Sequence, residues 1–112
     1  MLEFNEKYVF HIPCFKYKND ELIAINKENI IKDLVNQFNK HEYTSMYMTN
    51  VKGFYKSRCF DELLITIFTS KDSQQESPEV IFKQWFKSNN KILEQEAIAY
   101  EHNNKMIIEE LD

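Results

Sequence analysis

The most strongly strand-like part of the chain is the run Leu63-Leu64-Ile65-Thr66-Ile67-Phe68-Thr69. It is enriched in β-branched and aromatic side chains, which fit the pleated surface of a sheet. Its apolar residues are almost continuous, as is typical of a strand that is covered on at least one face. We therefore predict a central strand over residues 62–70.

The preceding segment, residues 44–58, is predicted to be a second strand that pairs with the first as a hairpin. Its residues alternate between two faces, with Tyr47 and Thr49 on one of them. The turn is expected near residues 58–61. Gly53, the only glycine of the chain, falls inside this strand. An isolated strand glycine indicates a bulge, a kink or close backbone approach.

Two other segments carry apolar residues at helical spacing. In residues 27–40 these form one stripe, and Asn26 is the predicted N-cap. The second helix begins at Ser77-Pro78-Glu79, which combines a capping side chain, a proline at the first helical position and an acid in the first turn. Its apolar stripe continues past Asn89, so the helix is extended to about Gln95. Alternatively, the asparagines at 89 and 90 end it early.

The two ends of the chain supply further strands. Residues 7–17 alternate as a strand does, and Pro13 predicts a bend or an edge position, because proline lacks the amide that a central strand needs. A polar turn at residues 18–21 follows, and residues 22–25 lead on to the first helix. Residues 96–108 are predicted to form a closing hairpin, since its central asparagines tolerate positive φ.

These elements give the order β-α-β-β-α-β-β in one domain over residues 1–112. Without its last strand this is the β-α-β-β-α-β order of the ferredoxin-like fold. We therefore predict an α+β protein with an antiparallel sheet and two helices on one face of it. The other face is expected to be solvated or covered by a partner, and a homodimer is one simple way to cover it.

The composition is that of an ordinary globular chain, with 43% hydrophobic and 29% charged residues. A net charge of −4 argues against binding to duplex nucleic acid, which relies on basic groups. No stretch approaches the roughly 20 apolar residues of a membrane span, and the acidic N-terminus is unlike a signal peptide. We expect a soluble, cytoplasmic protein with reduced cysteines and no membrane contact.

Motifs for cofactors and metals are missing from the sequence. One glycine cannot make a glycine-rich phosphate loop. Four side chains could bind zinc in principle, but only the first two are closely spaced: His11, Cys14, Cys59 and His102. We therefore predict neither a metal nor a cofactor, and assign the cysteines to packing. The acids toward the C-terminus, among them Glu94, Glu96 and Glu101, are interpreted as solvated surface.

One segment has the composition of a contact surface, because methionine and aromatic residues suit adaptable interfaces. Its residues are Met46, Tyr47, Met48, Phe54, Tyr55 and Arg58. Two other interpretations are a sheet core with a solvated edge, and a platform on which single-stranded nucleic acid or a flat ligand stacks.

Two functions are consistent with these patterns. The first is a small non-enzymatic binding or regulatory protein that acts through protein–protein contacts or self-association. The alternative is a cofactor-free small-molecule enzyme or ligand carrier, with His11 or His102 as the proton-transfer group. A deep, closed pocket that contains a histidine would favour the enzyme, whereas a flat, exposed apolar face would favour the binding protein.

Overall fold

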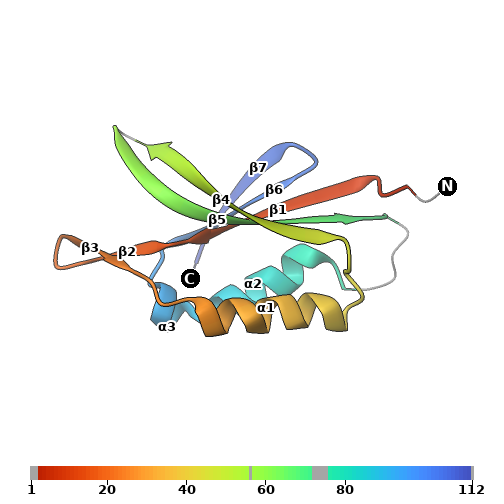
Figure 1. Cartoon of the computed structure of the whole chain (residues 1–112), viewed down its shortest axis with the longest axis horizontal. Coiled ribbons are helices and arrows are strands. Elements are labelled where there is room, and N and C mark those ends of the chain that lie inside the picture. Colours follow the sequence, from red (N-terminus) through yellow and green to blue (C-terminus); the bar gives the residue numbers. More distant parts are fainter. Residues whose placement is uncertain (1–2, 56, 72–75, 112) are drawn as a thin grey trace.

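In a computed structural model, which describes residues 3–55, 57–71 and 76–111, the helices lie on one face of an antiparallel sheet (Figure 1). This confirms the predicted α+β class. The elements in chain order are β1 (Glu6–Pro13), β2 (Phe15–Lys18), β3 (Glu21–Ala24), α1 (Glu28–Lys40), β4 (Met46–Tyr55), β5 (Arg58–Thr69), α2 (Pro78–Ser88), α3 (Asn90–Leu93), β6 (Ala97–His102) and β7 (Lys105–Glu110).

The main sheet has five strands in the order β4-β5-β1-β6-β7, and each neighbouring pair is antiparallel. The predicted interior position of the Leu63–Thr69 run is confirmed, because β5 pairs with both β4 and β1. The predicted turn at residues 58–61 is wrong. Arg58 already pairs with Tyr55, and the turn includes Ser57, whose φ is positive. The sequence places the turn too late because the charged residues Arg58, Asp61 and Glu62 make the start of β5 look like a turn.

The first predicted strand is divided at Pro13. Pro13 still pairs with Glu62 on β5, but the pairing with β6 ends at His11. The proline therefore lies where one side of the strand is free, as predicted. Beyond it the chain leaves the main sheet, and β2 and β3 form a separate two-stranded sheet. The strand character of β3 was not predicted, since all four of its residues are exposed and no apolar face marks it.

Each of the two predicted helices differs from the prediction at one end. α1 begins at Glu28 with Lys27 at the N-cap position, so the prediction of Asn26 as the cap is wrong. The predicted extension of the second helix to about Gln95 is wrong. α2 ends at Ser88, as the alternative interpretation of the asparagines requires, and a single further turn forms α3. The side chain of Asn89 donates a hydrogen bond to the Trp85 carbonyl, which satisfies an acceptor at the end of α2.

The core fills the space between the helices and the sheet. At its centre the ring of Phe10 on β1 lies 4.6 Å from that of Phe82 on α2 and 5.6 Å from that of Phe38 on α1. The indole nitrogen of Trp85 donates a 2.8 Å hydrogen bond to the Ile30 carbonyl, which joins α2 to α1. None of the helices in the described ranges is long and apolar enough to cross a membrane.

The opposite face of the sheet has no helix on it (Figure 1). The pairing register places Val9 and Thr66 at its centre, and both are buried by their neighbours. Tyr47, Met106 and Ile108 lie toward its two edges and are 51%, 55% and 68% exposed. This face, defined by these five residues and called the open sheet face below, combines a closed centre with exposed apolar side chains.

Candidate functional site: an acidic groove at the end of β1

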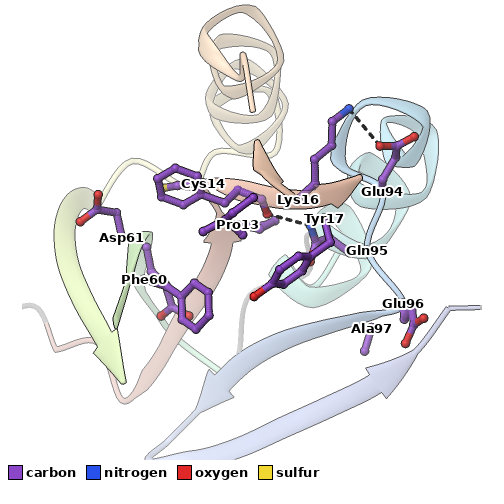
Figure 2. Close-up of a pocket in the computed structure, with 13 residues that line it drawn as sticks. Pro13, Cys14, Lys16, Tyr17, Phe60, Asp61, Glu94, Gln95, Glu96 and Ala97 are labelled. Atoms are coloured by element: carbon purple, nitrogen blue, oxygen red, sulfur yellow. Dashed lines mark hydrogen bonds and ion pairs between the residues drawn. The ribbon is translucent and has the colours of Figure 1, made fainter. Parts of the chain in front are cut away.

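A groove of about 710 Å³ lies where β1 ends and the chain turns away into β2. Its walls are the β2–β3 hairpin, the first part of β5 and the segment that joins α3 to β6 (Figure 2). Small-molecule sites have volumes of roughly 300–1,000 Å³. The lining residues are Pro13, Cys14, Phe15, Lys16, Tyr17, Leu22, Phe60, Asp61, Glu62, Glu94, Gln95, Glu96 and Ala97.

The hairpin is anchored to the α3–β6 segment by two side chains. The amide of Gln95 donates to the Phe15 carbonyl at 3.1 Å. The ammonium of Lys16 donates to the Ile92 carbonyl at 3.0 Å and lies 3.1 Å from a carboxylate oxygen of Glu94 (Figure 2). These contacts join residues that are about 80 positions apart in sequence, and they fix one wall of the groove to the other.

Aromatic rings provide apolar surface inside the groove. Figure 2 shows the Tyr17 ring projecting from the hairpin and the Phe60 ring projecting from β5. The guanidinium of Arg58 lies 5.8 Å from the centre of the Tyr17 ring and donates a hydrogen bond to its hydroxyl. Arg58 therefore holds the hairpin on the β5 side of the groove.

Carboxylates dominate the charge of the groove. Four of them line it, Asp61, Glu62, Glu94 and Glu96, against the single ammonium of Lys16. Lys16 is paired with Glu94, and Asp61 accepts a hydrogen bond from Lys52, which raises the pKa of that lysine. Within the described ranges, Glu62 and Glu96 form no ion pair with a lysine or an arginine. The groove is therefore a region of negative potential next to aromatic surface.

His11, one of the two predicted proton-transfer groups, lies beside the groove and does not line it. Its Nδ1 atom is 3.4 Å from Oε2 of Glu62, and its Nε2 atom is 2.7 Å from Oε2 of Glu101. Glu62 belongs to the groove, so His11 reaches the site only through this carboxylate. The groove is partly open to solvent and, among the described residues that line it, contains no histidine.

His102, the other candidate, lies elsewhere. It faces the helices, stacks on Tyr8 with ring centres 4.2 Å apart, and has its Nε2 atom 2.9 Å from a carboxylate oxygen of Glu6. Burial, together with the Glu79 carboxylate, raises the pKa of the Tyr8 hydroxyl. Because His11 and His102 lie on opposite faces of the sheet, the structure does not bring them together.

The predicted contact surface is divided between the two faces of β4. Met46 packs against the core, and Met48 lines an apolar hollow of about 480 Å³ beside α1. Tyr47 points the other way, onto the open sheet face. Alternation along one strand causes this division, since neighbouring side chains must point to opposite sides.

The remaining residues of that surface lie near the β4–β5 turn. Phe54 is 78% exposed, which is the largest exposure among the bulky apolar side chains that the structure describes. Tyr55 ends β4 opposite Arg58, and its side chain lies outside the described part of the chain. Arg58 contacts Tyr17 at the groove, so it belongs to a different site from Met46 and Met48.

The cysteines do not share a site. Cys14 is buried in the groove wall, whereas Cys59 is exposed, so the expected packing role applies to Cys14 and is wrong for Cys59. Among residues 3–55, 57–71 and 76–111, no three His, Cys, Asp or Glu side chains come together as a metal site.

Sequence reasoning missed the acidic groove. It interpreted the late acids as solvated surface, whereas Glu94 and Glu96 line a groove together with acids that precede them by more than 30 residues. Two signals pointed to the region without identifying it. Pro13 marked the bend that opens the groove, and the isolated Gly53 marked a close approach to Glu62.

Comparison with known proteins gives one structural likeness. No protein-family model and no curated protein sequence matches the chain. A solved structure of a phage SAM lyase in its apo state is similar, with a TM-score of 0.56 and 10% sequence identity. The likeness extends over 100% of this chain and 97% of that one. At this identity it concerns the fold.

Proposed function

We propose that this protein binds a small organic cation in the groove, and that S-adenosylmethionine (SAM) is the first ligand to test. The observation that carries this proposal is the pair of lining carboxylates, Glu62 and Glu96, with no lysine or arginine partner in the described ranges. A cation that enters the groove would supply the missing charge, and the rings of Tyr17 and Phe60 could stack on a flat or cationic group.

SAM combines the features that such a groove would select. Its sulfonium and ammonium groups are positive, and its adenine ring is flat. The full-length likeness in fold to a phage SAM lyase supports this choice, although a fold can host unrelated functions. Of the two functions considered from the sequence, this proposal corresponds to the ligand carrier named in the alternative. The groove is partly open and its described lining contains no histidine, so it is not the closed, histidine-containing pocket that would favour the enzyme.

Isothermal titration calorimetry with SAM tests the proposal, with chromatography of the mixture to detect any breakdown of SAM. We expect binding that falls by about tenfold in Glu96→Gln, because one charge-assisted contact is lost. Tyr17→Ala should also weaken binding, through the lost stacking surface. Glu28→Gln is the matched control, since Glu28 lies on α1 and outside the groove lining. Absence of binding by the wild-type protein, or equal affinity in all of these variants, contradicts the proposal.

We also propose that the main sheet is a ferredoxin-like arrangement with an added edge strand. Three observations support this assignment. β5 lies between β4 and β1, β6 adjoins β1 on the other side, and β7 extends that edge. In this interpretation the β2–β3 hairpin is an insertion between the first strand of the fold and its first helix, and the insertion forms one wall of the groove.

A second candidate function is protein binding or self-association through the open sheet face. It is favoured by the exposure of Tyr47, Met106 and Ile108 on a face without a helix. Contact of this face with a second copy of the chain would remove these side chains from water, and two-fold dimers are the commonest oligomers.

Native mass spectrometry and light scattering distinguish this candidate from a monomeric ligand-binding protein. If the open sheet face is the interface, Tyr47→Asp and Ile108→Asp should abolish the association. Phe54→Asp should not, since Phe54 is exposed on the other side of β4. A monomeric wild-type protein would exclude self-association, and association that survives both substitutions would exclude this face.

A further inference from the structure

The single glycine of the chain has no conformational reason for its position. Gly53 pairs regularly with Phe60, without a bulge, and its φ is not positive. A β-carbon at this position would instead lie 3.2 Å from Cδ of Glu62 and 3.4 Å from each of its carboxylate oxygens. The missing side chain therefore leaves space for the Glu62 carboxylate.

The Glu62 carboxylate is also contacted from the β1 side. His11 Nδ1 lies 3.4 Å from it, while His11 Nε2 lies 2.7 Å from Glu101. These two carboxylates are the charged groups that face His11 from the strands packed on either side, β5 and β6. The Glu62 carboxylate therefore lies next to Gly53 on β4 and His11 on β1, and it lines the groove.

We propose that Glu62 is the residue that recognises the positive sulfur of the ligand, and that Gly53 is a positioning residue for its carboxylate. This inference rests on the proposed function of the groove. It identifies which of the lining carboxylates sets the selectivity for a cation and how that carboxylate is positioned.

Calorimetry with two probes tests the inference: SAM, and S-adenosylhomocysteine, which lacks the positive sulfur. Glu62→Gln should weaken SAM binding by about tenfold and change binding of the neutral-sulfur probe by less than about twofold. Gly53→Val should act in the same direction, because its side chain displaces the carboxylate while valine suits a strand. Thr49→Val, on the same face of β4 and opposite Leu64, is the matched control and should leave both affinities unchanged.

The comparison of the two probes is a readout that a purely structural role would not change, because a general loss of structure would lower both affinities. The inference is overturned if Glu62→Gln and Gly53→Val weaken binding of both probes equally, or if they weaken binding of neither probe. The groove then remains the proposed site. If the wild-type protein does not bind SAM, the proposed function fails and the inference fails with it. Far-UV circular dichroism identifies any variant that does not fold. The variants that do fold then test the inference.

Discussion

The Nε2 atom of His102 lies 2.9 Å from a carboxylate oxygen of Glu6, a residue that is only 7% exposed. Desolvation by burial is the largest single influence on the pKa of Glu6, and it acts upward. Hydrogen bonds from Asn103 and His102, together with the charges of His102 and Lys71, outweigh it and hold the pKa below its ordinary value of 4.5. The Glu6 carboxylate therefore stabilises the folded protein in its ionised form.

The pH dependence of stability follows from this pKa. Because the folded-state pKa is lowered, the contribution of Glu6 is fully present above pH 4.5 and is lost as the pH falls through the folded-state pKa. Glu6→Gln should lower the free energy of unfolding by about 2 kcal/mol at neutral pH. Urea denaturation at a series of pH values measures the difference, with the exposed Glu3→Gln as control. A difference that stays constant down to acid pH would contradict this account.

The hydrogen bond between Trp85 and the Ile30 carbonyl predicts a specific cost for removing the indole nitrogen. Trp85→Phe keeps an aromatic ring in the core but leaves the carbonyl of Ile30 without this donor and part of the cavity unfilled. We expect a loss of about 1–3 kcal/mol in the free energy of unfolding. Chemical denaturation followed by circular dichroism checks this. A Trp85→Phe variant as stable as the wild-type protein would show that the hydrogen bond contributes nothing.

The hydrogen bond from Gln95 to the Phe15 carbonyl predicts that the β2–β3 hairpin opens more often when Gln95 is removed. Gln95→Ala removes the hydrogen bonds to the Phe15 and Leu93 carbonyls, whereas the hairpin contributes little to the core. Hydrogen exchange of the β2–β3 amides should accelerate while global stability changes by less than about 1 kcal/mol. Mass spectrometry of exchanged peptides measures both effects. Unchanged exchange in residues 15–24 would contradict the proposed anchoring.

The parts of the fold that the sequence predicted correctly are those in which the apolar pattern marks a face buried in the core. The run at 63–69 and the apolar stripes of the helices mark buried faces, so periodicity was sufficient to identify them. The β2–β3 hairpin was missed in part because it lies outside the core, and β3 is exposed throughout and has no apolar–polar alternation. The start of β5 was misplaced for the same reason, since residues 58–62 extend beyond the helices as an exposed hairpin.

The candidate site was less predictable because it depends on contacts between distant segments. Glu62 and Glu96 are 34 positions apart in sequence and line one groove only because β5 and β6 flank β1. A single sequence does not show which acids share a site. Gly53 was the useful signal, because its isolated position in a strand indicated a close approach. What approaches is a side-chain carboxylate, which the pattern alone could not specify.

The central claim is that a cationic ligand occupies the groove at the end of β1. Its most direct test is an NMR titration of ¹⁵N-labelled protein with SAM, in which the amide shifts are mapped onto the structure. The account predicts that the shifts concentrate at residues 14–17, 60–62 and 94–97, the three walls of the groove. Shifts confined to the hollow beside α1 or to the open sheet face, or no shifts at saturating SAM, would contradict it.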